Sequence, residues 1–173
     1  MGRRQVASVT SPLLRVTARG DREIVMTRDF SAPRHLVFDA WTKPDLVERW
    51  FGRREGWTTK AEIDLRPGGL YRFRLRDAGG REIVLRGEYR EIARPEWLVT
   101  LEGFEGFSET GWRPQDATES TTTFSERDGI TTWTATSRYP SKEVRDAVLH
   151  DPNMQTGMNE GFAALDAVLR DAK

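Results

Sequence analysis

The sequence predicts one α+β domain in which a curved antiparallel sheet of about six to seven strands wraps around a long C-terminal helix, with two short helices after the first strand. Three observations predict this class. Apolar residues recur at helical spacing before residue 52, alternate as in strands from 57 to 138, and return to helical spacing after 141. Turn dipeptides divide the alternating region into short strands. The last helix is the only element long enough to cover the apolar face that such a sheet must bury.

The N-terminal part of the chain is expected to lie apart from the rest. We expect residues 1–22 to be an extension that forms an edge strand around Val6, Val9 and Val16 or stays partly ordered. Residues 23–173 are expected to form the single domain. A strand is predicted to run to Phe30, just before Ala32-Pro33.

Two short helices are predicted next, over residues 33–42 and 44–51. Pro33 suits the first helical turn, where its missing N–H would be unpaired anyway, and Ser31 is the expected cap. The apolar spacing from Leu36 to Trp41 indicates one buried face. Pro44 begins the second helix and Gly52 ends it.

The middle of the chain alternates with period two. In residues 70–76, Tyr71, Phe73 and Leu75 are expected to point inward while the arginines between them face solvent. Asp128-Gly129 is a strong hairpin signal. The predicted strands are 57–65, 70–76, 83–92, 97–101, 118–126 and 130–138, with a loop at 103–117 that carries Phe104, Phe107 and Trp112.

The C-terminal region is predicted to hold a helix at 141–149, capped by Ser141, and a long helix at 152–171. One stripe of the long helix is apolar, formed by Met154, Met158, Phe162, Leu165 and Leu169. Gly157 and Gly161 lie beside the stripe and are expected to let the helix approach the sheet at one end. Bulky side chains hold it away elsewhere, so a cavity is expected between them.

Composition excludes several classes of protein. The 173 residues contain no cysteine and two histidines, so disulfides, thiolate catalysis and Cys- or His-based metal sites are not expected. Charge is balanced at 27 basic and 27 acidic residues, which argues against a nucleic-acid partner. No uncharged run approaches about 20 residues, and the N-terminus lacks a signal-like apolar segment. We expect a cytoplasmic protein without membrane contact, metal or cofactor, as a monomer or a homodimer.

The charges are unevenly placed along the chain. Residues 66–94 carry eight Arg and four acids, net +4, whereas residues 102–128 carry seven acids and two Arg, net −5. The two segments could form a docking surface for another protein. The alternative is that they are the solvated faces of strands.

Five segments, in this order along the chain, are typical of one protein family. They are Arg28–Pro44, Arg49-Trp50-Phe51-Gly52, Asp64–Gly69, Gly87–Ile92 with Pro95-Glu96, and Tyr139–Gly161. Together they resemble the Hsp90-ATPase-activator homologue (AHSA1-like) family of the START-like, or SRPBCC, superfamily, over residues 23–172. Trp50-Phe51-Gly52-Arg53 departs from the commoner Trp-Trp-Gly-Pro form of that family.

The resemblance implies a helix-grip fold with a deep hydrophobic pocket. It also implies three roles: binding a small apolar or amphipathic ligand, binding a chaperone or other protein partner as the namesake domain binds Hsp90, or acting as a cyclase or hydrolase. No catalytic set is recognisable in the sequence, so ligand binding is the preferred hypothesis.

The candidate ligand-binding residues are mainly aromatic, because aromatic side chains bury a large area with few rotamers to fix. Gly87 stands in the middle of a strand, where it leaves space for a ligand or marks a bend of the sheet. The methionines suit a pliable pocket wall. The full set is Trp41, Trp50, Phe51, Trp57, Tyr71, Phe73, Gly87, Tyr89, Trp133, Met154, Met158 and Phe162.

Overall fold

The computed structural model describes residues 13–105 and 116–173. Within them one antiparallel sheet has eight strands in the order β1-β2-β8-β7-β6-β5-β4-β3. The strands are β1 (Arg15–Arg19), β2 (Glu23–Phe30), β3 (Thr58–Ile63), β4 (Leu70–Arg76), β5 (Glu82–Ala93), β6 (Trp97–Glu105), β7 (Thr118–Arg127) and β8 (Ile130–Arg138). The helices are α1 (Arg34–Thr42), α2 (Pro44–Trp50), α3 (Lys142–Leu149) and α4 (Pro152–Asp171).

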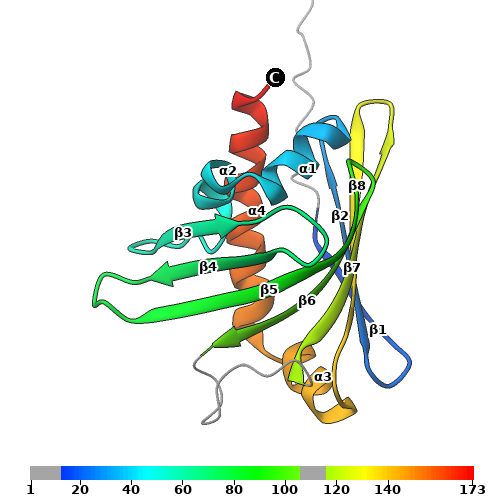
Figure 1. Cartoon of the computed structure of the whole chain (residues 1–173), viewed down its shortest axis with the longest axis vertical. Coiled ribbons are helices and arrows are strands. Elements are labelled where there is room, and N and C mark those ends of the chain that lie inside the picture. The colour runs from blue at the N-terminus through cyan, green and yellow to red at the C-terminus, as the bar shows by residue number, and fades with distance from the viewer. Residues whose placement is uncertain (1–12, 106–115) are drawn as a thin grey trace, which may run out of the picture.

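The layers follow the predicted class. The sheet curves around α4, with α1 and α2 near one end of that helix and α3 near the other (Figure 1). The expected α+β fold with a long C-terminal helix is confirmed. Among the described residues, no helix combines the length and apolarity needed to cross a membrane.

The sheet has eight strands where about six to seven were expected, and β6 is longer than predicted. Val16 lies in β1, which pairs with β2, whereas Val6 and Val9 fall outside the described residues. Strand β6 continues to Glu105, so the predicted loop begins later than residue 103. Phe107 and Trp112 also fall outside the described residues.

The alternation in β4 is confirmed. Tyr71 and Phe73 are buried, Leu75 is half-buried, and Arg74 and Arg76 are exposed. Neighbouring strands keep this alternation, so one face of the sheet is covered by helices and the other faces solvent. We call the helix-covered, concave side the inner face and the opposite side the outer face.

Helix starts are set by caps, and one prediction about them is wrong. Helix α1 begins at Arg34, so its N-cap is Pro33 rather than Ser31, and no side chain caps it. The other three predicted starts are confirmed. Helix α2 begins at Pro44, the Ser141 hydroxyl accepts from the Val144 N–H, and the Asp151 carboxylate accepts from the Asn153 N–H.

The apolar stripe of α4 faces the sheet. Phe162, Leu165 and Leu169 are buried, and Met154 and Met158 are half-buried against the same core. The predicted helix at 152–171 is therefore confirmed as one continuous element.

The two glycines of α4 face α2 and the segment after it, not the sheet. A Cβ on Gly161 would lie 3.3 Å from the Trp50 carbonyl oxygen, and one on Gly157 would meet the Arg54 guanidinium. The expectation that these glycines bring α4 close to the sheet is therefore wrong. They bring it close to α2, because no side chain then separates the two backbones.

A buried ion pair ties α4 to the sheet. Arg28 on the inner face of β2 is 3% exposed, and its Nη1 and Nη2 donate to the two carboxylate oxygens of Asp166 at 2.9 and 2.7 Å. The guanidinium also lies 4.5 Å from the centre of the Phe30 ring. This two-pronged contact fixes the rotation of α4 over β2.

Candidate functional site

The inner face begins, at the α1 end, with a packed aromatic cluster. Trp41 lies 5.6 Å from Trp133 and 4.6 Å from Trp50, measured between ring centres. Phe162 of α4 meets Trp133 edge-on at 5.1 Å. Four of the candidate residues therefore lie together, in direct contact with one another.

A second aromatic group covers the inner face of β4 and β5. Phe51 contacts Phe73 at 4.9 Å, and the Tyr71 ring lies 5.3 Å from Phe73 and 5.0 Å from Tyr89. Trp57 stands just before β3 and is half-buried. The two groups are joined through Trp50 and Phe51, whose ring centres are 5.6 Å apart, and Met154 and Met158 lie on the helix that covers them.

Beside these groups, part of the inner face carries polar side chains. In one row across the sheet, Tyr71 pairs with Gly87, and Gly87 pairs with Glu102 of β6. In the next row, Thr100 pairs with Ser120, which pairs with Ser137. The hydroxyl oxygens of Ser120 and Ser137 are 2.8 Å apart. We call Tyr71, Thr100, Glu102, Ser120 and Ser137 the inner polar cluster.

Gly87 lets Tyr71 reach Glu102, because it has no side chain to block the Tyr71 ring. The Tyr71 ring crosses above Gly87, and its hydroxyl donates to Oε2 of Glu102 at 2.5 Å. A Cβ on Gly87 would lie 2.0 Å from Tyr71 Cζ and 2.3 Å from its hydroxyl oxygen. The interpretation of Gly87 as open space is therefore wrong. The glycine is needed because the Tyr71 ring fills the space above it.

Burial sets the electrostatics of the cluster. It raises the pKa of the Glu102 carboxyl, and the hydrogen bond from Tyr71 offsets only part of that effect. Burial and then the charge of Glu102 raise the pKa of Tyr71, of Tyr89 and of Tyr139, the last to about 12. Glu102 is thus an inward-facing acid with an unusually strong hold on its proton.

Replacing Glu102 by Gln is expected to stabilise the protein at neutral and higher pH. A raised pKa means that the folded state holds the Glu102 proton more tightly than the unfolded state does. Its stabilising contribution is complete below the unfolded pKa and is lost as pH rises through the folded pKa. Glu102→Gln should therefore match the wild type below about pH 4 and exceed it by on the order of 1 kcal/mol near pH 8, measured by urea unfolding.

Glu105→Gln is the matched control, because Glu105 lies on the outer face of the same strand and binds Arg72. That variant should gain nothing as pH rises. If Glu102→Gln were less stable than the wild type at every pH, the Glu102 carboxylate would stabilise the fold, contrary to this prediction.

The outer face carries charges that pair with one another. Arg72 bonds both oxygens of Glu105 at 3.2 and 3.0 Å, and Arg86 approaches the same carboxylate at 3.7 Å. Arg76 pairs with Glu82 at 3.0 Å. The basic segment 66–94 and the start of the acidic segment 102–128 therefore balance part of each other's charge within the sheet.

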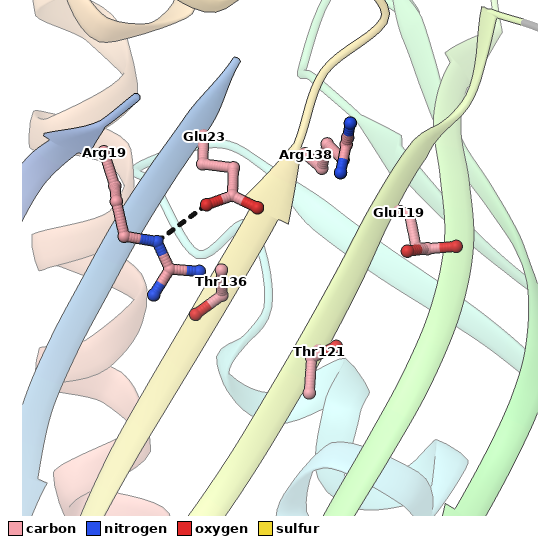
Figure 2. A pocket seen from close by; sticks show the side chains of 6 residues that line it. All are labelled: Arg19, Glu23, Glu119, Thr121, Thr136 and Arg138. Atoms are coloured by element: carbon pink, nitrogen blue, oxygen red, sulfur yellow. Dashed lines mark hydrogen bonds and ion pairs between the residues drawn. The ribbon is translucent and has the colours of Figure 1, made fainter. Parts of the chain in front are cut away.

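A shallow polar depression of about 280 Å³ lies on the outer face near β1, β2, β7 and β8. Figure 2 shows its side chains, with the Arg19–Glu23 ion pair at one side and two threonines at its floor. Its lining is Arg19, Glu23, Glu119, Thr121, Thr136 and Arg138. A neighbouring depression of about 360 Å³ is lined by Ala117, Glu119, Arg138, Tyr139 and Pro140. Neither contains any of the predicted ligand-binding residues.

Within residues 13–105 and 116–173, no three His, Cys, Asp or Glu side chains are grouped so that they could hold a metal ion. His150 lies at the end of α3, with Nδ1 2.8 Å from the Asp146 carbonyl oxygen. The polar groups on the inner face are the Glu102 carboxyl and the hydroxyls beside it, which form the hydrogen bonds described above.

These features define a helix-grip protein: a concave antiparallel sheet, a long C-terminal helix across it, and an aromatic interior with polar groups on the sheet. The chain belongs to the family described as activator of Hsp90 ATPase homolog 1-like proteins, which matches residues 31–170. The resemblance seen in the sequence motifs is confirmed.

Solved structures show the same fold. A protein from Rhodobacter sphaeroides is 24% identical with a TM-score of 0.80, covering 91% of this chain and 99% of that one. A protein from Mycobacterium smegmatis is 25% identical with a TM-score of 0.76, covering 94% and 100%. One from Staphylococcus epidermidis is 27% identical with a TM-score of 0.70, covering 90% and 94%. Comparison with curated proteins gives no significant match.

Proposed function

We propose that this protein binds a small hydrophobic or amphipathic ligand in an internal cavity between the inner face of the sheet and α4. The observation that carries the proposal is the inner polar cluster. Polar side chains on a helix-covered face reduce stability unless they have partners, and a core without a ligand gains more from apolar residues there. Glu102 and the hydroxyls beside it are the groups that would orient a ligand.

Small side chains support a space at the middle of the inner face. Along β8, Ala135 and Ser137 follow the large Trp133, and their partners across β7 are Thr122 and Ser120. Large aromatic residues stand on either side of this region. A helix held away by Phe162 and Met158 would leave room above these short side chains, as a concave binding site requires.

Trp133 supplies a further polar group. Its side chain is 4% exposed, and its indole N–H has no hydrogen-bond partner among the described residues. Most buried donors in proteins are paired, so an unpaired one calls for an explanation. An acceptor atom of a bound ligand would satisfy it, and Trp133 is one of the residues predicted to line the cavity.

The other predicted residues would form the wall of this site. Trp41, Trp50 and Phe162 would close the α1 end, while Phe51, Phe73 and Tyr89 would line the β4–β5 side. Met154 and Met158 would form the helix side, where their flexible thioethers adapt to different ligands. Tyr71 donates the hydrogen bond to Glu102, and Gly87 leaves the room that the Tyr71 ring occupies.

An enzyme of the cyclase or hydrolase kind that uses the same cavity is the second candidate. It is favoured by Glu102, an inward-facing acid whose pKa burial raises. Binding to a chaperone, suggested by the family description, is a third reading. It draws less support from the charged segments, because several of their charges are already paired within the sheet.

The proposal predicts that wild-type protein binds the neutral dye Nile red and that Ala135→Phe abolishes this binding. The phenyl ring would occupy the space above Ser137 and Ser120, lowering dye affinity by at least about tenfold while thermal unfolding shows a folded protein. Thr136→Phe is the matched control, since Thr136 lies on the outer face of the same strand. It should leave dye binding unchanged.

Two outcomes would contradict the cavity. The wild type would show no saturable dye fluorescence, or Ala135→Phe would bind the dye as the wild type does. Failure of Ala135→Phe to fold would also count against the proposal, because overpacking a filled core destabilises it by about 1–3 kcal/mol or more.

A further inference from the structure

We infer that Glu102 selects the class of ligand: an amphipathic molecule whose polar end is an amine or an alcohol, and not a carboxylate. This inference rests on the proposed function, because it assigns the polar end of the ligand that the cavity would hold.

The carboxylate of Glu102 points to the inner face. Glu102 alternates with Leu98 and Thr100 along β6, and both of these are buried under the helices. Across the sheet it pairs with Gly87, and the Tyr71 hydroxyl reaches over that glycine to bond it. Glu105, three residues further on, points outward to Arg72. The strand therefore presents one acid to each side.

Only one oxygen of the Glu102 carboxylate is engaged within the part of the chain that the structure describes. Tyr71 donates to Oε2, and Oε1 has no hydrogen-bond partner there. A carboxylate can accept several hydrogen bonds, so Oε1 is available to a donor from outside the protein. A hydroxyl or ammonium group of a ligand could supply that donor, while Ser120 and Ser137 are bonded to each other.

The surrounding charges favour a cation or a neutral donor over an anion. The buried cations of the described residues, Arg28 and Arg145, are held by Asp166 and by Asp146. Neither is free to neutralise a ligand carboxylate. An ammonium group beside Glu102 would favour the ionised form of this carboxyl and donate a charge-assisted hydrogen bond to it, whereas a ligand carboxylate could not be accommodated there without one of the two acids giving up its charge. Attraction of an amine and exclusion of a carboxylate would therefore both favour the amine ligand.

Competition among three ligands of equal chain length tests this inference. Decylamine, decanol and decanoate would each displace Nile red from wild-type protein near neutral pH, below the concentrations at which they form micelles. We expect decylamine to compete best, decanol next and decanoate least, with about tenfold or more between amine and acid.

Glu102→Gln should remove the preference for the amine while leaving decanol within about threefold of its wild-type affinity. Glu105→Gln is the control, because it removes an acid of the same strand from the outer face. Decanoate binding as tightly as decylamine, or an unchanged order in Glu102→Gln, would overturn the inference while dye binding still supports the cavity. If the wild type binds neither the dye nor any of the three compounds, the proposed function itself fails and the inference fails with it.

Discussion

Phe162→Ala is expected to lower the free energy of unfolding by about 3–5 kcal/mol, the usual effect of truncating a buried aromatic side chain. Phe162 is 2% exposed and meets the Phe30 ring at 5.5 Å and the Trp133 ring at 5.1 Å, both edge-on. Its loss leaves a cavity where α4 joins the sheet. Urea unfolding measures the effect, and an unchanged dependence on urea would show that the change is in stability.

Asn159→Ala provides the control for Phe162→Ala, because Asn159 lies on the exposed side of the same helix. Its effect should stay within about 0.5 kcal/mol. A loss below about 1 kcal/mol for Phe162→Ala would mean that the packing of α4 on the sheet is not as described.

Asp166→Ala is also expected to lower the free energy of unfolding by about 3–5 kcal/mol. The substitution leaves the buried Arg28 guanidinium without its counter-charge. Both nitrogens of Arg28 that bond Asp166 lie within 2.9 Å of its carboxylate oxygens. The remaining cation would stay beside the rings of Phe30 and Phe162, which cannot replace a carboxylate. Thermal and urea unfolding would both report the loss.

The double variant Arg28→Met, Asp166→Leu separates pairing from packing. It removes both charges and keeps the volume, so it should recover most of the stability lost in Asp166→Ala. If the double variant were no more stable than the single one, the charges themselves would not account for the effect.

Most of the fold could be predicted from the sequence, because it depends on local signals. The alternation of Tyr71, Phe73 and Leu75 and the turn at Asp128-Gly129 placed strands where the structure has them. Local signals do not show which strands pair with each other. Strand β1 lies at the edge of the sheet, and nothing in a segment rich in Ser, Thr and Arg shows that β2 will bind it.

The candidate site was only partly visible in the sequence, for a related reason. The aromatic residues stand out by type, and several of them do meet on the inner face. Glu102 was missed because an acid in a segment of net charge −5 suggests a solvated position. Its inward direction follows from alternation with Leu98 and Thr100, but only once β6 is known to continue past residue 101.

Gly87 shows most clearly which features of the site the sequence alone does not predict. A glycine in the middle of a strand signals close approach without saying what approaches. Only the register that places Tyr71 and Glu102 on either side of Gly87 reveals a side chain crossing the glycine to reach an acid. Whether the space above Gly87 is empty or filled depends on which strands pair with β5, and a single sequence does not show this pairing.

The binding of decanol, followed through the indole N–H resonances of the tryptophans, tests the central claim that a ligand sits between the inner face and α4. Trp133 lies on the inner face with an unpaired N–H, whereas Trp97 lies on the outer-facing side of β6. The account predicts a saturable shift of the Trp133 resonance and none at Trp97. A saturable shift at Trp97 alone, or no saturable shift at any tryptophan, would contradict it.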